Sequence, residues 1–175
     1  IPGLTVSAIN NFLYISDWNA KKVHRVDLSV TNSVSVSSWS VPSRPYGISM
    51  TSVGNILVAF YSINSINEYT PSGSLVRQVT TNISNTWKAV EVSNNVWAVI
   101  PVSSSATNPM ITMDTNGTRI SSYGLVSQPS DLLMDSRGYF LVAQWNSNEI
   151  HVVNPSLTDH RVIQFPVNVQ MNNPY

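Results

Sequence analysis

The sequence predicts an all-β protein built from four copies of one four-stranded antiparallel unit. Three observations predict it: similar segments recur along the 175 residues, each copy contains four short alternating strands, and turn-forming residues separate those strands. The copies are marked by a common landmark at Pro2, Pro45, Thr86, Pro129 and Pro174, spaced by 43, 41, 43 and 45 residues. A period of this length with four strands per unit is typical of a β-propeller blade.

The second strand of each copy is the most apolar and carries the clearest likeness. The four segments are Phe12–Trp18, Ile56–Tyr61, Val96–Val102 and Phe140–Trp145. A short alternating strand precedes each of them, across a tight turn of Asn or Gly residues, as expected of a hairpin: Asn10-Asn11, Gly54-Asn55, Asn94-Asn95 and Arg137-Gly138.

The third and fourth strands follow at the same spacing in every copy. The third strands are predicted at 23–26, 66–69, 110–113 and 150–153, and the more polar fourth strands at 34–36, 75–79, 119–123 and 161–165. The blades therefore span about 1–43, 44–85, 86–127 and 128–172 of a single repeat array covering 1–175. Residues 173–175 stand at the start of a fifth-blade phase.

The order of proline, alternating strand, Gly/Asn turn, LYISDW-like strand and VHRVD-like strand resembles the NHL-repeat family over the whole chain. The resemblance implies a propeller and leaves the function open, since that family includes lyases, scaffolds and recognition modules. Six blades are usual in such rings. Four blades therefore predict an incomplete ring, or one completed by another chain, whose terminal blades expose apolar faces.

Composition narrows the classes of function. Nine basic and nine acidic residues balance, and phosphate neutralisation dominates binding to nucleic acid, so no nucleic-acid partner is expected. No apolar run reaches the length of a spanning helix, so no membrane insertion is expected either. Charged residues make up only 10%, which with abundant Ser and Asn favours an extracellular or cell-surface location. Asn82 and Asn116 begin glycosylation sequons at predicted turns.

Loops that join strands four to one and two to three meet at one rim of a propeller. Aromatic side chains there suit a sugar or an extended peptide, although equivalent positions also serve to pack blades together. The candidate binding rim consists of Trp18, Tyr46, Tyr61, Trp87 and Trp145, with Arg44, Lys21 and Lys22 nearby.

Catalytic and metal chemistry have little sequence support. His24 and His151 occupy equivalent positions and are weak zinc candidates, because His160, the remaining histidine, is expected in a turn away from them. Scattered carboxylates are too few near the axis for a calcium cage, and Asp27 and Asp114 are expected to stabilise turns. No nucleophile elbow or phosphate loop occurs, so no cofactor is expected.

The sequence therefore favours a non-catalytic extracellular module that self-associates, or docks partners, through its exposed terminal blades. Two alternatives remain open. One is a fragment of a six-bladed NHL-like lyase or lactonase-type hydrolase, and the other is a carbohydrate-recognising propeller that uses its aromatic rim.

Overall fold

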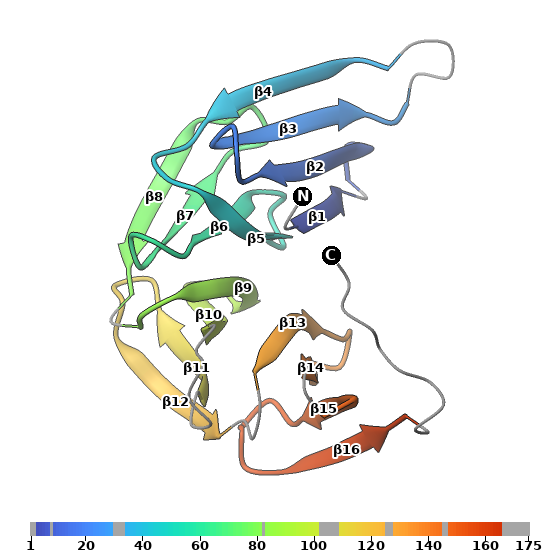
Figure 1. Cartoon of the computed structure of the whole chain (residues 1–175), viewed down its shortest axis with the longest axis vertical. Helices are drawn as coiled ribbons and strands as arrows, with labels where there is room; N and C mark the ends of the chain where they lie inside the picture. Colours follow the sequence, from blue (N-terminus) through green and yellow to red (C-terminus); the bar gives the residue numbers. More distant parts are fainter. Residues whose placement is uncertain are drawn as a thin grey trace.

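A computed structural model describes residues 3–7, 9–29, 34–81, 83–101, 109–124, 128–144 and 147–165. All regular elements in these ranges are β-strands (Figure 1). Blade 1 comprises β1 (Gly3–Ser7), β2 (Phe12–Asp17), β3 (Lys22–Asp27) and β4 (Val36–Ser40). Blade 2 comprises β5 (Pro45–Met50), β6 (Ile56–Phe60), β7 (Ser65–Tyr69) and β8 (Leu75–Thr80). Blade 3 comprises β9 (Thr86–Ser93), β10 (Val96–Pro101), β11 (Pro109–Asp114) and β12 (Arg119–Gly124). Blade 4 comprises β13 (Pro129–Met134), β14 (Phe140–Gln144), β15 (Glu149–Val153) and β16 (His160–Gln164).

Each blade is a separate antiparallel sheet whose strands pair in sequence order. The first strands β1, β5, β9 and β13 lie toward the centre and contact one another in succession, while the fourth strands lie at the periphery (Figure 1). Figure 1 shows an arc that stays open between blade 1 and blade 4. The prediction of an all-β propeller of four four-stranded blades without a closed ring is confirmed. Among the described residues there is no helix of the length and apolarity that a membrane crossing requires.

The hairpins form because the turns contain residues that accept a left-handed backbone. Asn11, Gly54, Asn95 and Gly138 occupy the equivalent turn between first and second strands, with φ values of 54°, 85°, 67° and 85°. Glycine adopts positive φ freely and asparagine tolerates it better than most residues. The turn chemistry therefore fixes the register in which the apolar second strands pair.

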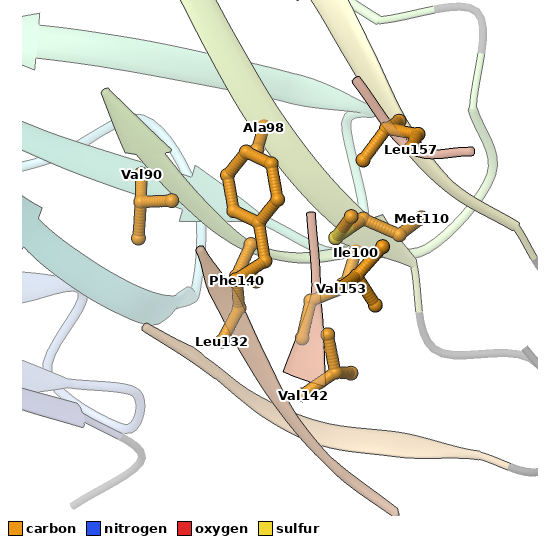
Figure 2. Close-up of a cluster of buried hydrophobic side chains, with 9 residues drawn as sticks. All are labelled: Val90, Ala98, Ile100, Met110, Leu132, Phe140, Val142, Val153 and Leu157. Atoms are coloured by element: carbon orange, nitrogen blue, oxygen red, sulfur yellow. The ribbon is translucent and has the colours of Figure 1, made fainter. Parts of the chain in front are cut away.

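Side chains from adjacent blades interlock in three buried clusters, one per interface. Alternate residues of each strand point to opposite faces, so a central blade supplies one cluster from each face. In β6, Ile56, Val58 and Phe60 pack toward blade 1, whereas Leu57 packs toward blade 3. Figure 2 shows the cluster between blades 3 and 4, where Phe140 lies among residues of both sheets. Blade-to-blade packing is therefore the core of this protein.

One expected strand lies elsewhere. The fourth strand of blade 1 was predicted at 34–36, but β4 spans Val36–Ser40, and residues 34 and 35 belong to no strand. Trp39 explains the difference: it pairs with Val23 and makes an edge-to-face contact with Tyr14, with ring centroids 6.2 Å apart. Burying this indole between blades 1 and 2 outweighs pairing the smaller Val34.

Candidate functional site

The structure gathers four of the five predicted rim aromatics into one cluster, the aromatic rim. Tyr46 lies in its middle, with ring centroids 6.3 Å from Trp18, 5.5 Å from Tyr61 and 4.7 Å from Trp87. All four side chains are half-buried, so each ring both packs against a neighbour and keeps surface toward solvent. The fifth predicted residue, Trp145, lies outside the described residues.

The aromatic rim is anchored by backbone hydrogen bonds from neighbouring blades. The Ser16 hydroxyl of β2 donates to the Tyr46 carbonyl at 2.8 Å. The Trp87 indole Nε1–H donates to the Ser130 carbonyl of β13, also at 2.8 Å. The aromatic rim therefore connects all four blades, and two of its residues are held in place before any ligand arrives.

Positive charge lies at the blade 1 end of the aromatic rim. The Arg44 guanidinium carbon stands 3.9 Å from the centroid of the Trp18 ring, in cation–π geometry. The backbone N–H of Val41 donates to the Lys21 carbonyl at 3.0 Å, so the loop before β5 lies against the loop between β2 and β3. Lys21 therefore lies in the same corner as Arg44, whereas Lys22 pairs with Asp17 on the outer face of blade 1.

The two ends of the arc carry a second type of surface. The outer face of blade 1 is the face turned away from blade 2, and the strand register identifies its members. Leu4 pairs with Ile15, and the equivalent pair in blade 2 is Ile48 with Val58. Leu4 is nevertheless 62% exposed, whereas Ile48 is only 1% exposed. The apolar side chains of this outer face are Leu4, Val6, Leu13, Ile15, Val26 and Val36.

The outer face of blade 4, turned away from blade 3, shows the same pattern. Ile150 pairs with Ile163 as Ile66 pairs with Val79 in blade 2, where both side chains are buried against blade 3. In blade 4, Ile163 is 43% exposed and Leu133, on the same face, 54%. The apolar side chains of this outer face include Leu133, Leu141, Ile150 and Ile163.

The two histidines at equivalent positions have unlike surroundings. His24 Nε2 lies 3.2 Å from an Asp17 carboxylate oxygen and is partly exposed. The pKa of Asp17 is lowered, first by the backbone N–H of Ala20 and then by the His24 hydrogen bond. Within the described ranges, no group of three or more His, Cys, Asp and Glu side chains could hold a metal ion.

His151 belongs to a cluster that sequence reasoning missed. It is buried, lies 3.3 Å from the Tyr123 hydroxyl and 3.2 Å from a Glu149 oxygen, and stacks on His160 with ring centroids 5.6 Å apart. The expectation that His160 sits in a turn away from His151 is wrong. His160 begins β16 and pairs with Val153, which follows His151 by two residues in β15. Extending the fourth strand by one residue would have placed it correctly.

The Asn116 sequon and the turn carboxylates lie apart from both surfaces. Asn116 is exposed in the turn between β11 and β12, whereas Asn82 lies outside the described residues. Asp114 accepts hydrogen bonds from the backbone N–H groups of Asn116 and Thr118, and Asp27 accepts one from Ser29. Both aspartates therefore stabilise turns as predicted.

The chain is similar to propellers of known structure. It matches virginiamycin B lyase from Staphylococcus aureus at 18% identity and a TM-score of 0.70, covering 94% of this chain and 55% of that one. It matches a streptogramin B lyase at 17% identity and a TM-score of 0.74, covering 96% of this chain and 57% of that one. It matches a chain of a nidogen/laminin complex at 16% identity and a TM-score of 0.74, covering 94% of this chain and 65% of that one.

These likenesses show the β-propeller fold alone, because the identities are low and the neighbours include both lyases and a protein–protein complex. The chain spans less than two thirds of each solved chain. No protein-family model matches the sequence, and no curated protein matches it.

Proposed function

We propose that this chain is a non-catalytic assembly module that joins copies of itself head to tail. The outer face of blade 4 of one copy would pack on the outer face of blade 1 of the next. The observation that carries the proposal is that both outer faces expose the apolar positions that the three internal interfaces bury. Large contiguous apolar surfaces on soluble proteins mark interaction sites.

A second copy suits these faces because they are the two unused halves of an interface that the chain already makes three times. The outer face of blade 1 corresponds to the faces that blades 2, 3 and 4 turn toward the preceding blade. The outer face of blade 4 corresponds to the faces that blades 1, 2 and 3 turn toward the following one. Contact between them would extend the existing packing without a new type of surface.

Such a contact is heterologous, since it joins two different patches. A heterologous contact gives a closed ring when its rotation closes and a filament when it does not. Two copies would give a ring of eight blades, and a larger assembly would give a stack. In Figure 1 no described strand lies against the outer face of blade 1 or that of blade 4.

The test combines light-scattering mass with two charge substitutions. Leu4→Asp disrupts only the outer face of blade 1, and Ile163→Asp only that of blade 4. The control, Val53→Asp, changes an exposed valine in the turn between β5 and β6, away from both faces. We expect oligomers for the wild type and for Val53→Asp, and monomers for each of the other variants.

Mixing the two interface variants tests the head-to-tail geometry. Each variant keeps one intact face, and the intact faces are complementary, so the mixture should form a heterodimer that neither variant forms alone. Far-ultraviolet circular dichroism checks that both remain folded. A wild type that stays monomeric at all concentrations refutes self-association, and a mixture without heterodimer refutes the head-to-tail arrangement. Oligomers that persist in both variants would place the interface elsewhere.

Two finer assignments belong to the same proposal. We assign the blades to the NHL type on the strength of the repeated LYISDW-like and VHRVD-like strands. We place the protein outside the cell or on its surface because of its low charge and the exposed Asn116 sequon. The rival assignment, a piece of a six-bladed lyase or lactonase, predicts stoichiometric calcium or zinc in the purified chain, which metal analysis would detect.

A further inference from the structure

The aromatic rim combines features that packing between blades does not require. The hydroxyls of Tyr46 and Tyr61 have no hydrogen-bond partner among the described residues, and both side chains are half-buried. Their rings are tilted by 38° to each other, and the Trp87 ring is tilted by 44° to Tyr46. The surface therefore presents a series of flat apolar facets with hydroxyl groups beside them.

Charge gives this surface a preference that the whole chain lacks. Lys21 and Arg44 are two of only nine basic residues, and the loops that carry them lie against each other at one end of the aromatic rim. The nearby Asp17 carboxylate is engaged by the Ala20 N–H and by His24. Arg44 is exposed and donates no hydrogen bond within the described part of the chain, so the edge of its guanidinium is available to a ligand.

Arg44 is also held in a productive orientation. Its guanidinium lies over the Trp18 ring, and this contact restricts the orientations that its N–H groups can sample. A planar fork of donors in a fixed orientation matches a carboxylate, with which it forms paired charge-assisted hydrogen bonds. A ligand that carries carboxylates therefore fits this site.

We propose that the aromatic rim binds an acidic oligosaccharide, a chain of uronic-acid residues. The apolar faces of pyranose rings would lie on Tyr46, Tyr61 and Trp87, and a carboxylate would meet Arg44. Sugars suit the rim because its flat aromatic faces can cover the apolar faces of pyranose rings, and an acidic peptide is the alternative that the test below must exclude. This surface is separate from both outer faces, so the inference stands or falls independently of self-assembly.

The test is a calorimetric titration with galacturonic-acid oligosaccharides, alongside neutral cello-oligosaccharides of equal length and sulfated heparin oligosaccharides. We expect the galacturonate chains to bind, more weakly as salt rises, and the neutral chains to bind at least about tenfold less tightly. A lost hydrogen bond to a charged group costs about 1.5–3 kcal/mol, which corresponds to a loss of tenfold or more.

Substitutions connect the binding to the rim. Arg44→Gln should weaken galacturonate binding by at least about tenfold, and Tyr46→Ala should abolish it. Arg137→Gln is the matched control, because Arg137 also lies over an aromatic ring, 5.4 Å from the Tyr139 centroid, but in a hairpin turn on the opposite rim. The Arg137→Gln variant should bind galacturonate chains as tightly as the wild type does.

Several results would overturn the inference. Failure of every oligosaccharide to bind refutes the site, as does an Arg44→Gln variant that binds like Arg137→Gln. Binding of only the sulfated chains refutes the carboxylate assignment, and equal binding of neutral chains refutes the role of charge. Binding of a poly-glutamate peptide in place of the saccharide would assign the rim to acidic peptides. Leu4→Asp should retain binding whatever its oligomeric state.

Discussion

Leu132 and Leu133 allow a direct comparison of how much a leucine stabilises the chain on a buried inner face and on an exposed outer face. They are neighbours in β13 and chemically identical, but Leu132 is fully buried against blade 3 and Leu133 is 54% exposed on the outer face of blade 4. Truncating a fully buried leucine to alanine costs about 2–5 kcal/mol, because a cavity adds to the lost transfer free energy. Truncating a half-exposed one costs about 1 kcal/mol, roughly half of the transfer value for full burial.

The assay is urea unfolding followed by tryptophan fluorescence, with the free energy of unfolding obtained by linear extrapolation. In dilute solution Leu132→Ala should lower it by about 2–5 kcal/mol and Leu133→Ala by about 1 kcal/mol. As the concentration rises and copies associate, the cost of Leu133→Ala should grow while that of Leu132→Ala stays constant. If the two substitutions lower the free energy of unfolding equally in dilute solution, the assignment of the two leucines to opposite faces is wrong. If the cost of Leu133→Ala does not change with protein concentration, Leu133 is not buried in an assembly.

Three further perturbations have defined outcomes. Gly47→Ala should destabilise the chain by more than a surface substitution does, because a Cβ at this position would stand 2.5 Å from the Trp87 carbonyl oxygen. A melting temperature equal to that of the wild type would contradict this close approach. The backbone N–H of Thr118 lowers the pKa of Asp114 below its ordinary 3.8, so the stabilisation by this carboxylate is present above pH 3.8 and is lost as pH falls through the lower folded pKa. Asp114→Asn should therefore reduce the loss of stability at acid pH. An unchanged acid part of the stability–pH curve would show that Asp114 does not contribute to it. Expression in a glycosylating host should add a glycan mass that Asn116→Gln reduces, whereas an identical mass for both proteins would show that this sequon is unused.

Repetition made the fold predictable from the sequence. The equivalent turns use Asn11 and Asn95 in two blades and Gly54 and Gly138 in the others, and all four adopt positive φ. Either residue marks the same backbone requirement, so the hairpins could be placed without knowledge of tertiary contacts. The apolar terminal faces followed in turn, because a repeated unit with two buried faces must leave one uncovered at each end of an open array.

Tertiary contacts decided what the sequence left ambiguous. Around β4, Val34, Val36 and Trp39 support two registers in a Ser-rich segment, and only packing of Trp39 on Tyr14 selects the observed one. The His151–His160 stack likewise depends on where β16 begins, which alternation alone does not define. Which of the aromatic rings meet at the rim depends on how adjacent blades rotate, a property that no local pattern encodes.

The pairing of β-strands only within consecutive quartets has a consequence for how this protein can change over evolutionary time. In the described blades no hydrogen-bonded ladder crosses from one sheet to the next. An in-frame duplication or loss of about 43 codons would therefore insert or delete a complete unit without rethreading its neighbours. The size of such a repeat array is set by the number of its units, and an open array can persist as long as something covers its two terminal faces.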